Sequence, residues 1–494
     1  MKVAFSAIGL LLLLAGAAPA FAGTPDTLWS RTYGGQSSDI GYAVVGTTDS
    51  GFVIAGTTSS FGPETTDAYV VRVAGDGDLL WSRRVGGLGY DEAHSVCQTF
   101  DGGYAVGGWS TSADTFIQHA WLARLDSGGD TVWTRTYGGT GSSWVSCLIQ
   151  TADSGFLLCG GRDSTNSGSF TAYLVRTNSA GVQRWSLTYG VSGADVANAV
   201  VPFPGGGFAV CGSNFSGNGL ALLLRVSETG SLVWARNYGT AANYNWAGTL
   251  LVTPDSDLVI AGEQGPALDR HGSGLRVSYD QRGQLRAKDL EWNTDLWLLR
   301  TNAGGDSLWS ATWGDTNRDC AGSMQPVTGG WVVAATDGLY SGTANMSLLR
   351  FSAAGDVLWE AGYPGLGVGQ VNGLVLPPDG GYTVAATTDI LGAGSDDVLL
   401  VRFGSDAGIL DEPGRSETAR QTSAQTIARN ALFLAEAPGC GPQSASLMDA
   451  AGRKAAELHA GVNDVGGLAP GVYFVREAQA QAQAQAVRKV VVTK

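Results

Sequence analysis

A unit of roughly 50 residues recurs along most of this chain, and each copy carries a tryptophan at the same place. The tryptophans are Trp29, Trp81, Trp133, Trp185, Trp234, Trp309 and Trp359, separated by 52, 52, 52, 49, 75 and 50 residues. Such a period, with several short strand patterns per unit, is typical of β-propeller blades, because one blade cannot bury its own faces without neighbours. We therefore expect an all-β, seven-bladed β-propeller.

Each repeat has the pattern of four strands. In the first repeat, residues 28–33, 42–47, 52–56 and 67–72 are strand-like and are separated by turn residues. A glycine stands four residues before each later tryptophan, at Gly77, Gly129, Gly181, Gly230, Gly305 and Gly355. Glycine permits the positive φ angles that tight hairpin turns require. Each repeat is therefore predicted to form one four-stranded sheet.

An arginine also recurs nine residues before the tryptophan. The arginines are Arg72, Arg124, Arg176, Arg225, Arg300 and Arg350, with Arg402 in the last repeat. A half-buried guanidinium needs hydrogen-bond acceptors. Because every repeat uses it, we expect a structural role in which the arginine pairs with a carboxylate or carbonyl of its own or the next blade.

The two ends of the repeat region predict how the ring closes. The strand that contains Trp29 precedes any complete repeat, and the last repeat ends after the strand that contains Arg402. Pairing these two strands would complete seven four-stranded sheets and leave no open edge in the ring. We therefore expect the N-terminal strand to close the last blade.

The segment YLVRTNSAGVQRWS, residues 173–186, and its siblings resemble the tryptophan-docking repeats of quinoprotein-type propellers. The resemblance implies that each tryptophan locks neighbouring blades together. It covers the repeat region only. No cofactor-binding constellation accompanies it, so no cofactor is expected and quinone chemistry is not carried over.

The N-terminus has the pattern of a secretory signal peptide over residues 1–22. Met1 and Lys2 precede the apolar run 3–18, and Ala20 and Ala22 stand at the positions expected before a cleavage site. We expect export to the extracellular space or the bacterial cell surface, with no transmembrane segment in the mature chain.

The net charge of −14 argues against nucleic acid as a partner, since binding to phosphate backbones needs basic residues.

The domains expected after the signal peptide are a propeller over 23–403, a linker over 404–428 and a small β-sandwich over 429–494. The segments Asp449–Lys454, Leu468–Arg476 and Arg488–Val492 resemble the C-terminal sorting domain of the bacterial type IX secretion system. The resemblance implies that outer-membrane secretion machinery is a partner. The alternative is a small β-domain without a sorting role.

The sequence offers no catalytic or metal-binding motif. Its four histidines stand apart from any cysteine or carboxylate cluster. The six cysteines are read as buried small hydrophobes, with a bridge between Cys159 and Cys211, which occupy equivalent positions, as the alternative. Three equivalent aspartates are read as turn caps, with a calcium or polar-ligand ring as the alternative: Asp39, Asp91 and Asp195.

The fifth repeat carries an insertion near residues 263–292, between its second and third strands. Insertions in repeat proteins concentrate on one face, which is often the binding face. Five aromatic residues at or near this face are the predicted ligand site: Tyr90, Trp144, Tyr244, Trp246 and Trp292. Two functions fit them, a non-enzymatic binding or adhesion module for a glycan or protein, and a polysaccharide lyase or hydrolase. Packing in the core or loops is the structural alternative.

Overall fold

The computed structural model describes residues 24–62, 66–111, 117–190, 195–214, 219–240, 243–266, 294–314, 318–338 and 344–406, together with the C-terminal ranges 426–428, 431–434, 444–449, 453–459, 461–464, 471–477 and 487–492. The chain divides into two compact units, of which one spans Pro25–Ala407. The described residues contain strands and no helix. None of them therefore forms a helix that could cross a bilayer.

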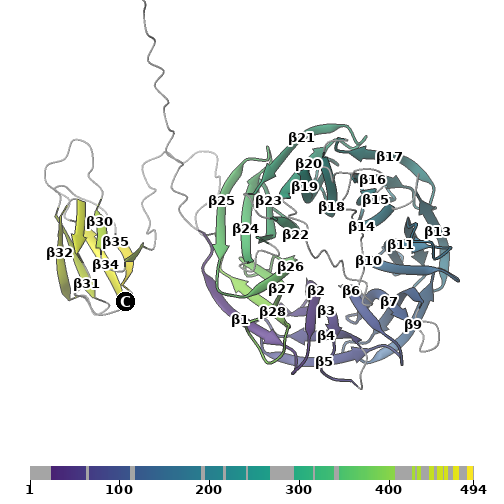
Figure 1. Cartoon of the computed structure of the whole chain (residues 1–494), viewed down its shortest axis with the longest axis horizontal. Coiled ribbons are helices and arrows are strands. Elements are labelled where there is room, and N and C mark those ends of the chain that lie inside the picture. The colour runs from purple at the N-terminus through teal and green to yellow at the C-terminus, as the bar shows by residue number, and fades with distance from the viewer. Residues whose placement is uncertain are drawn as a thin grey trace, which may run out of the picture. The chain divides into compact units, whose positions relative to one another are not determined.

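The unit Pro25–Ala407 is a ring of seven four-stranded antiparallel sheets, as predicted (Figure 1). Blade 1 contains β2 (Asp39–Gly46), β3 (Phe52–Thr58), β4 (Asp67–Val73) and β5 (Leu79–Val85). Blade 2 contains β6 (Asp91–Gln98), β7 (Tyr104–Thr111), β8 (Gln118–Leu125) and β9 (Thr131–Tyr137). Blade 3 contains β10 (Ser142–Gln150), β11 (Phe156–Asp163), β12 (Thr171–Thr177) and β13 (Gln183–Tyr189).

The remaining blades follow the same order. Blade 4 contains β14 (Asp195–Pro202), β15 (Phe208–Asn214), β16 (Leu220–Val226) and β17 (Leu232–Tyr238). Blade 5 contains β18 (Asn243–Val252), β19 (Leu258–Pro266), β20 (Asp295–Thr301) and β21 (Ser307–Trp313). Blade 6 contains β22 (Cys320–Val327), β23 (Gly330–Asp337), β24 (Asn345–Ser352) and β25 (Val357–Tyr363). Blade 7 contains β26 (Val368–Val375), β27 (Tyr382–Thr388), β28 (Asp397–Phe403) and the N-terminal strand β1 (Thr27–Tyr33).

The ring closes as the sequence predicts. Strand β1 pairs antiparallel with β28, so that Trp29 lies opposite Arg402. The junction continues past the strand ends, where the Gly404 amide donates to the Asp26 carbonyl at 2.9 Å. The Tyr363 hydroxyl of blade 6 donates to the Pro25 carbonyl at 2.7 Å. The two ends of the propeller chain are therefore joined within one blade, and blade 6 holds the junction from the side.

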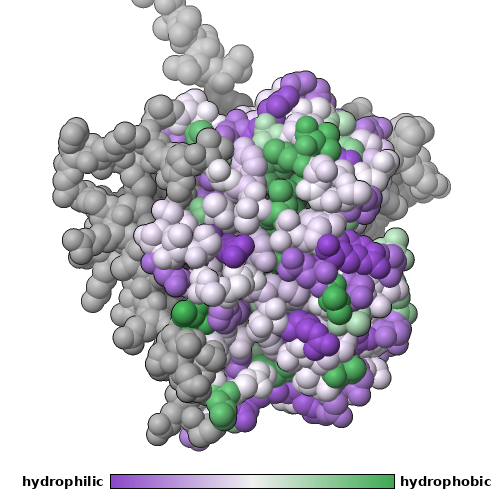
Figure 2. All heavy atoms as spheres, turned by 90° about the vertical axis from the view of Figure 1, so that its right-hand side faces the viewer, coloured by the Kyte–Doolittle hydropathy of each residue, from purple (hydrophilic) through white to green (hydrophobic). Residues whose placement is uncertain are grey.

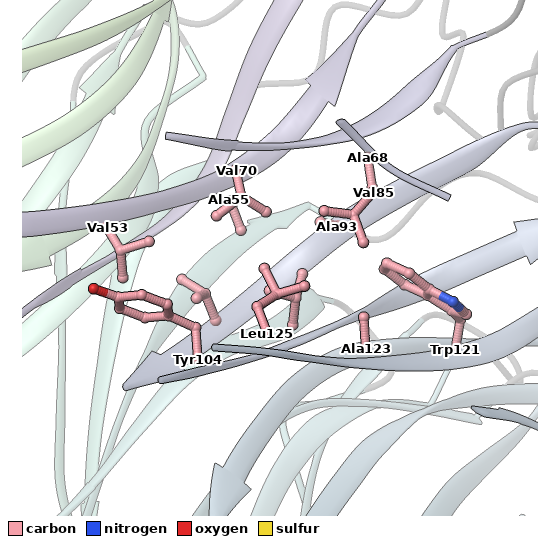
Figure 3. Packing of buried hydrophobic residues seen from close by; sticks show 12 residues of the cluster. Val53, Ala55, Ala68, Val70, Val85, Ala93, Tyr104, Trp121, Ala123 and Leu125 are labelled. Atoms are coloured by element: carbon pink, nitrogen blue, oxygen red, sulfur yellow. The ribbon is translucent and has the colours of Figure 1, made fainter. Parts of the chain in front are cut away.

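Apolar side chains fill the space between neighbouring blades. Figure 3 shows Val53, Ala55 and Val70 of blade 1 facing Tyr104 and Leu125 of blade 2. All five are at most 3% exposed. Five further interfaces of the same kind are built from the corresponding strands around the ring. This burial between sheets explains why both faces of the middle strands are apolar.

Six of the seven outer-strand tryptophans lie against the glycine turn of the next blade, whereas Trp359 Nε1 donates to Asp406 Oδ2 at 3.3 Å. A Cβ added to Gly129 of blade 2 would lie 2.8 Å from the ring of Trp81 of blade 1. Trp81 also packs edge-on against Tyr104, with ring centroids 5.7 Å apart. Gly129 has a φ of 83°, so the glycine is required both by its backbone angle and by the ring above it. The predicted docking between blades is thus observed.

The recurring arginines bind acceptors, as expected for a structural role. Each lies directly opposite a tryptophan in the pairing between the third and the outermost strand of its blade. Arg72, 3% exposed, donates to both carboxylate oxygens of Asp49, at 2.5 and 2.6 Å, and to the Tyr104 hydroxyl of the next blade at 3.0 Å. Arg225, which lacks a nearby aspartate, donates instead to the carbonyls of Phe208 and Gly206.

The outer rim exposes single apolar side chains. Residues directly before five of the tryptophans are between 52 and 60% exposed: Leu28, Leu80, Val132, Val233 and Leu308. Figure 2, which views the propeller from the side of β9 and β13, shows separate hydrophobic patches among hydrophilic residues. Scattered apolar residues of this kind are normal on soluble surfaces.

The C-terminal part also consists of strands in the residues that are described. Five of them form one sheet, in the order β29 (Thr426–Ala428), β35 (Val487–Val492), β34 (Gly471–Glu477), β31 (Ser444–Asp449) and β32 (Lys454–His459). A second sheet pairs β30 (Ala431–Leu434) with β33 (Gly461–Asp464). Two sheets are what a small β-sandwich requires.

Candidate functional site

The seven inner strands, which surround the axis of the ring, all contain a β-bulge at the same position (Figure 1). In each hairpin with the second strand, the pairing skips one residue of the inner strand at this position, and β26 also skips Gly369. We call the skipped residues the bulge ring: Tyr42, His94, Ser146, Asn198, Gly248, Gly322 and Asn372. A bulge frees a residue from the ladder and re-aims its side chain, and such features are common beside functional sites.

Three contacts of the bulge ring link one inner strand to the next. Asn198 Nδ2 donates to the Ala247 carbonyl at 2.8 Å, and Asn372 Nδ2 donates to the Gly41 carbonyl at 2.7 Å. In both cases the acceptor directly precedes the bulge residue of the following blade. The rings of Tyr42 and His94 stack with their centroids 4.6 Å apart and their planes at 7°. Part of the ring is therefore structural, whereas Tyr42 and His94 form an aromatic pair.

A second ring of positions lies two residues before each bulge. It contains Ile40, Glu92, Trp144, Val196, Trp246, Cys320 and Gln370. Two residues of the predicted ligand site, Trp144 on β10 and Trp246 on β18, thus take equivalent places, separated by blade 4. Both are half-buried, and Gln370 is exposed. The second ring therefore offers two indole surfaces and an amide.

Each of these two indoles rests on a glycine. A Cβ added to Gly161 would lie 2.3 Å from the Trp144 ring, and one added to Gly248 would lie 2.4 Å from the Trp246 ring. Trp144 also packs edge-on against Phe170, with centroids 5.0 Å apart. Glycine lets a flat ring lie against the backbone with no side chain between them. The two rings are held in defined orientations while part of each stays exposed.

The other predicted ligand residues lie elsewhere. Tyr90, in the connection before β6, is half-buried, and its amide donates to Thr111 Oγ1 at 2.8 Å. Tyr244 is only 8% exposed and lies against Gly219, so it contributes to packing. Trp292 lies outside the described residues. The insertion that contains Trp292 does fall between the second and third strands of its blade, β19 and β20, as predicted.

One carboxylate and one histidine meet on β6, the inner strand of blade 2. Glu92 of the second ring, 4% exposed, has its Oε2 atom 3.0 Å from His94 Nε2. The Tyr42 ring stacks on one face of the imidazole. A carboxylate that orients an imidazole is a common arrangement in acid–base sites. The sequence did not reveal this trio, because Tyr42 belongs to one repeat and the other two residues to the next.

A buried ion pair lies at the junction between blades 5 and 6. Arg318 donates to both carboxylate oxygens of Glu263, at 3.1 and 3.0 Å, and the Thr294 hydroxyl donates to Oε2 at 3.0 Å. Glu263 lies in β19 and Thr294 directly precedes β20, so these contacts hold the two strands that flank the insertion. Both side chains are at most 15% exposed, so the two charges neutralise each other inside the protein.

Asp39 and Asp91 cap turns, as the sequence predicts. Asp39 Oδ2 accepts from the Gly35 amide at 2.7 Å and from the Ser60 hydroxyl at 2.5 Å. Asp91 Oδ2 accepts from the Gly87 amide at 2.8 Å, and burial raises the pKa of its carboxyl. Asp319 holds the same position in blade 6, which the sequence reading missed. Among the residues that the structure describes, no three potential ligands are grouped to hold a metal ion.

The cysteines are free thiols in the described residues, and three of them are buried, namely Cys159, Cys211 and Cys320. Cys159 and Cys211 pack into different clusters, between blades 3 and 4 and between blades 4 and 5 respectively. They are not bridged in this structure, in line with the favoured interpretation as small buried hydrophobes.

No known family model matches this chain, and no curated protein matches its sequence. Solved propellers match its structure. The WD40 domain of Neurospora crassa Pan2 is 9% identical with a TM-score of 0.42, covering 77% of this chain and 98% of that one. The β-propeller domain of the Trilobed protease from Pyrococcus furiosus is 8% identical with a TM-score of 0.40, covering 76% and 94%.

A puromycin hydrolase S511A mutant in complex with PGG is 13% identical with a TM-score of 0.43, covering 74% of this chain. The chain spans about half of that protein, 52% of its length. These matches include both enzymes and non-enzymes. With identities of at most 13% and TM-scores below 0.5, they carry no functional information.

Proposed function

We propose that this protein is a non-enzymatic binding or adhesion module for a glycan or a protein, presented outside the cell. The observation that carries the proposal is the pair of half-buried indoles, Trp144 and Trp246, at equivalent places of the second ring and each seated on a glycine. A pre-oriented aromatic surface next to polar groups binds the apolar face of a sugar or an apolar side chain at low entropic cost. Gln370, which is exposed, supplies a polar group on the same ring.

A second candidate is a polysaccharide-degrading enzyme, a lyase or a hydrolase. The trio Glu92, His94 and Tyr42 favours it, because it places a carboxylate, an imidazole and a phenol together on the inner strands of blades 1 and 2. In such a site the histidine would move a proton while the carboxylate orients it. Both candidates use the same surface, and they differ in whether a bound sugar is turned over.

Export completes the proposal. The signal-peptide pattern over residues 1–22 supports secretion, and the resemblance of the C-terminal segments to type IX sorting domains supports passage through outer-membrane secretion machinery. The docking of Trp81 on the Gly129 turn is likewise the feature that supports kinship with tryptophan-docked quinoprotein-type propellers. No quinone cofactor belongs to the proposal.

A glycan array on the mature protein, run beside an activity screen on the same sugars, tests the proposal. We expect binding that weakens at least about tenfold in Trp144→Ala and in Trp246→Ala, as for aromatic hot spots. Phe100→Ala is the matched control, because Phe100 is 70% exposed but lies in the β6–β7 turn, at the other end of the inner strand from the second ring. Circular dichroism confirms that each variant folds.

The outcomes separate the candidates. Binding without turnover, lost in both tryptophan variants, supports the binding module. Turnover that His94→Ala abolishes while binding persists supports the enzyme instead. If sugars or proteins bind and neither tryptophan variant changes their affinity, the second ring is not the site and the proposal fails.

A further inference from the structure

Two cysteines of blade 3 lie directly opposite each other. The antiparallel ladder between β10 and β11 resumes after its bulge with Cys147 paired to Cys159. Directly opposed residues in such a ladder have Cα atoms about 4.5 or 5.5 Å apart. A disulfide needs Cα atoms about 4.4–6.8 Å apart. The backbone therefore already satisfies the main spatial condition for a bridge.

The two thiols also point the same way. Opposed residues project from the same face of a sheet, and both cysteines pack into the same cluster between blades 3 and 4, with Leu157, Leu174 and Val200. The strand register and the shared face of the sheet therefore both suit a bridge.

The neighbouring cysteines are placed less well for pairing. Cys97 lies opposite Ala105, and Cys211 lies opposite Ala199 and Leu223. The Cys211 thiol is directed instead towards the Ala247 carbonyl of blade 5, at 4.0 Å. Among the described cysteines, Cys147 and Cys159 are the one cross-strand pair.

The two thiols differ in reactivity. The hydrogen bond from Cys159 lowers the pKa of the Cys147 thiol, whereas burial raises the pKa of the Cys159 thiol. Burial likewise raises the pKa of Cys97 to about 12. Cys147 is also half-buried, while Cys159 is only 1% exposed. Since the thiolate is the nucleophile, Cys147 is the residue that reacts first with an oxidant.

We propose that Cys147 and Cys159 are an oxidation site that forms a cross-strand disulfide in blade 3 when a small disulfide or a thiol oxidoreductase is present. The Cys147 thiolate attacks one sulfur of the oxidant, forms a mixed disulfide and releases one thiolate. Cys159 then loses its proton and attacks the Cys147 sulfur, which releases the second thiolate. Two cysteine thiols are oxidised, and the oxidant disulfide is reduced to two thiols.

Tryptic mapping of the full-length protein tests this site. The native protein is incubated with glutathione disulfide, denatured, alkylated and digested. No lysine or arginine lies between Arg135 and Arg162, so Cys147 and Cys159 share the peptide 136–162. We expect that peptide to be two hydrogen masses lighter and to take up no alkylating agent. Protein reduced beforehand should instead carry two alkyl groups on it.

Two variants make the experiment decisive. Cys159→Ala removes the resolving thiol, so glutathione should remain attached to Cys147 after oxidation. Cys320→Ala is the matched control, because Cys320 belongs to blade 6 and should leave the oxidation of 136–162 unchanged. The oxidised protein should also melt at a higher temperature than the reduced protein, because a crosslink restricts the unfolded chain.

The digest shows the competing outcomes directly. A bridge from Cys159 to Cys211 would join the peptide 136–162 to the separate peptide 185–225. That crosslink, full alkylation of both cysteines after oxidation, or retention of glutathione on Cys147 in the unchanged protein would each overturn the proposal.

Discussion

Single residues in this propeller are selected by two independent demands, backbone angle and contact with the next blade. Every glycine that stands four residues before a tryptophan has a φ between 74 and 91°. The first hairpin turn of each blade is subject only to the first requirement, the backbone angle. Its left-handed position is held by Gly102 in blade 2 but by Ser50, Ser154 and Ser256 in three other blades. Where a ring packs on the turn, only glycine is found, and where none does, serine is tolerated.

Gly129 and Gly102 allow the two demands to be separated. Both belong to blade 2 and have nearly the same φ, 83° and 84°, but only Gly129 has the Trp81 ring above it. We expect Gly102→Ala to lower the free energy of unfolding by about 1 kcal/mol, the cost of left-handed backbone. Gly129→Ala should cost about 1–3 kcal/mol more, because the methyl group overlaps the indole. Urea denaturation of both variants measures these changes in the free energy of unfolding. Equal losses in the two variants would show that the Trp81 ring does not constrain Gly129.

At the scale of elements, the turn between the first and second strands anchors the third strand. In blade 2 the Thr99 hydroxyl donates to Asp101 Oδ1 at 2.6 Å, and Asp101 accepts from Arg124 of β8 at 2.5 Å. Blades 1 and 3 repeat the arrangement with Thr47 and Thr151. The Thr99 hydroxyl and then the Arg124 guanidinium lower the pKa of Asp101. Each such turn is therefore held most firmly when its carboxylate is ionised.

This pairing gives the hairpin a testable dependence on pH. Because the pKa of Asp101 is lower in the folded protein, its contribution to stability is full above the unfolded pKa of about 3.9 and is lost as the pH falls through the folded value. The carboxylate is 72% exposed, so the effect is small. We expect Asp101→Asn to melt below the unchanged protein at pH 7 and the difference to shrink in acid. A difference that stays constant down to pH ~2 would exclude the ionic contribution.

The elements also show what the sequence could and could not predict. The four strands, their turns and the docking tryptophans follow from residues that recur in every repeat. The bulge ring could not be predicted in this way, because its residues share no chemistry, as Tyr42, His94, Asn198 and Gly248 show. Their common position appears only in the pairing register of the strands. Only part of the candidate site can therefore be predicted from the sequence. Trp144 and Trp246 are recognisable as aromatic residues near the insertion-bearing face, while Glu92 and His94 carry no such signal.

At the scale of the whole molecule, stability depends on closure of the ring. Each blade buries its faces only against its two neighbours, so an open junction would expose the apolar faces of blades 7 and 1 together. The core between these blades includes Tyr33 of β1 with Val44, Ile54 and Leu400. The Tyr33 hydroxyl also donates to the Gly77 carbonyl of blade 1 at 2.7 Å. Strand β1 is thus part of the last blade and of its interface with the first.

Removing residues 24–33 tests closure. Without β1, the strand β28 becomes an unpaired edge and the turn at Gly77 loses Trp29 and Tyr33. We expect a clear drop in melting temperature. A synthetic peptide of residues 24–34 should restore it in a concentration-dependent way, because a ligand that binds only the folded state stabilises it. The same peptide with Trp29→Ala should restore it less, and a scrambled peptide should not restore it. If the shortened chain melts like the full chain, the ring does not depend on its N-terminal strand.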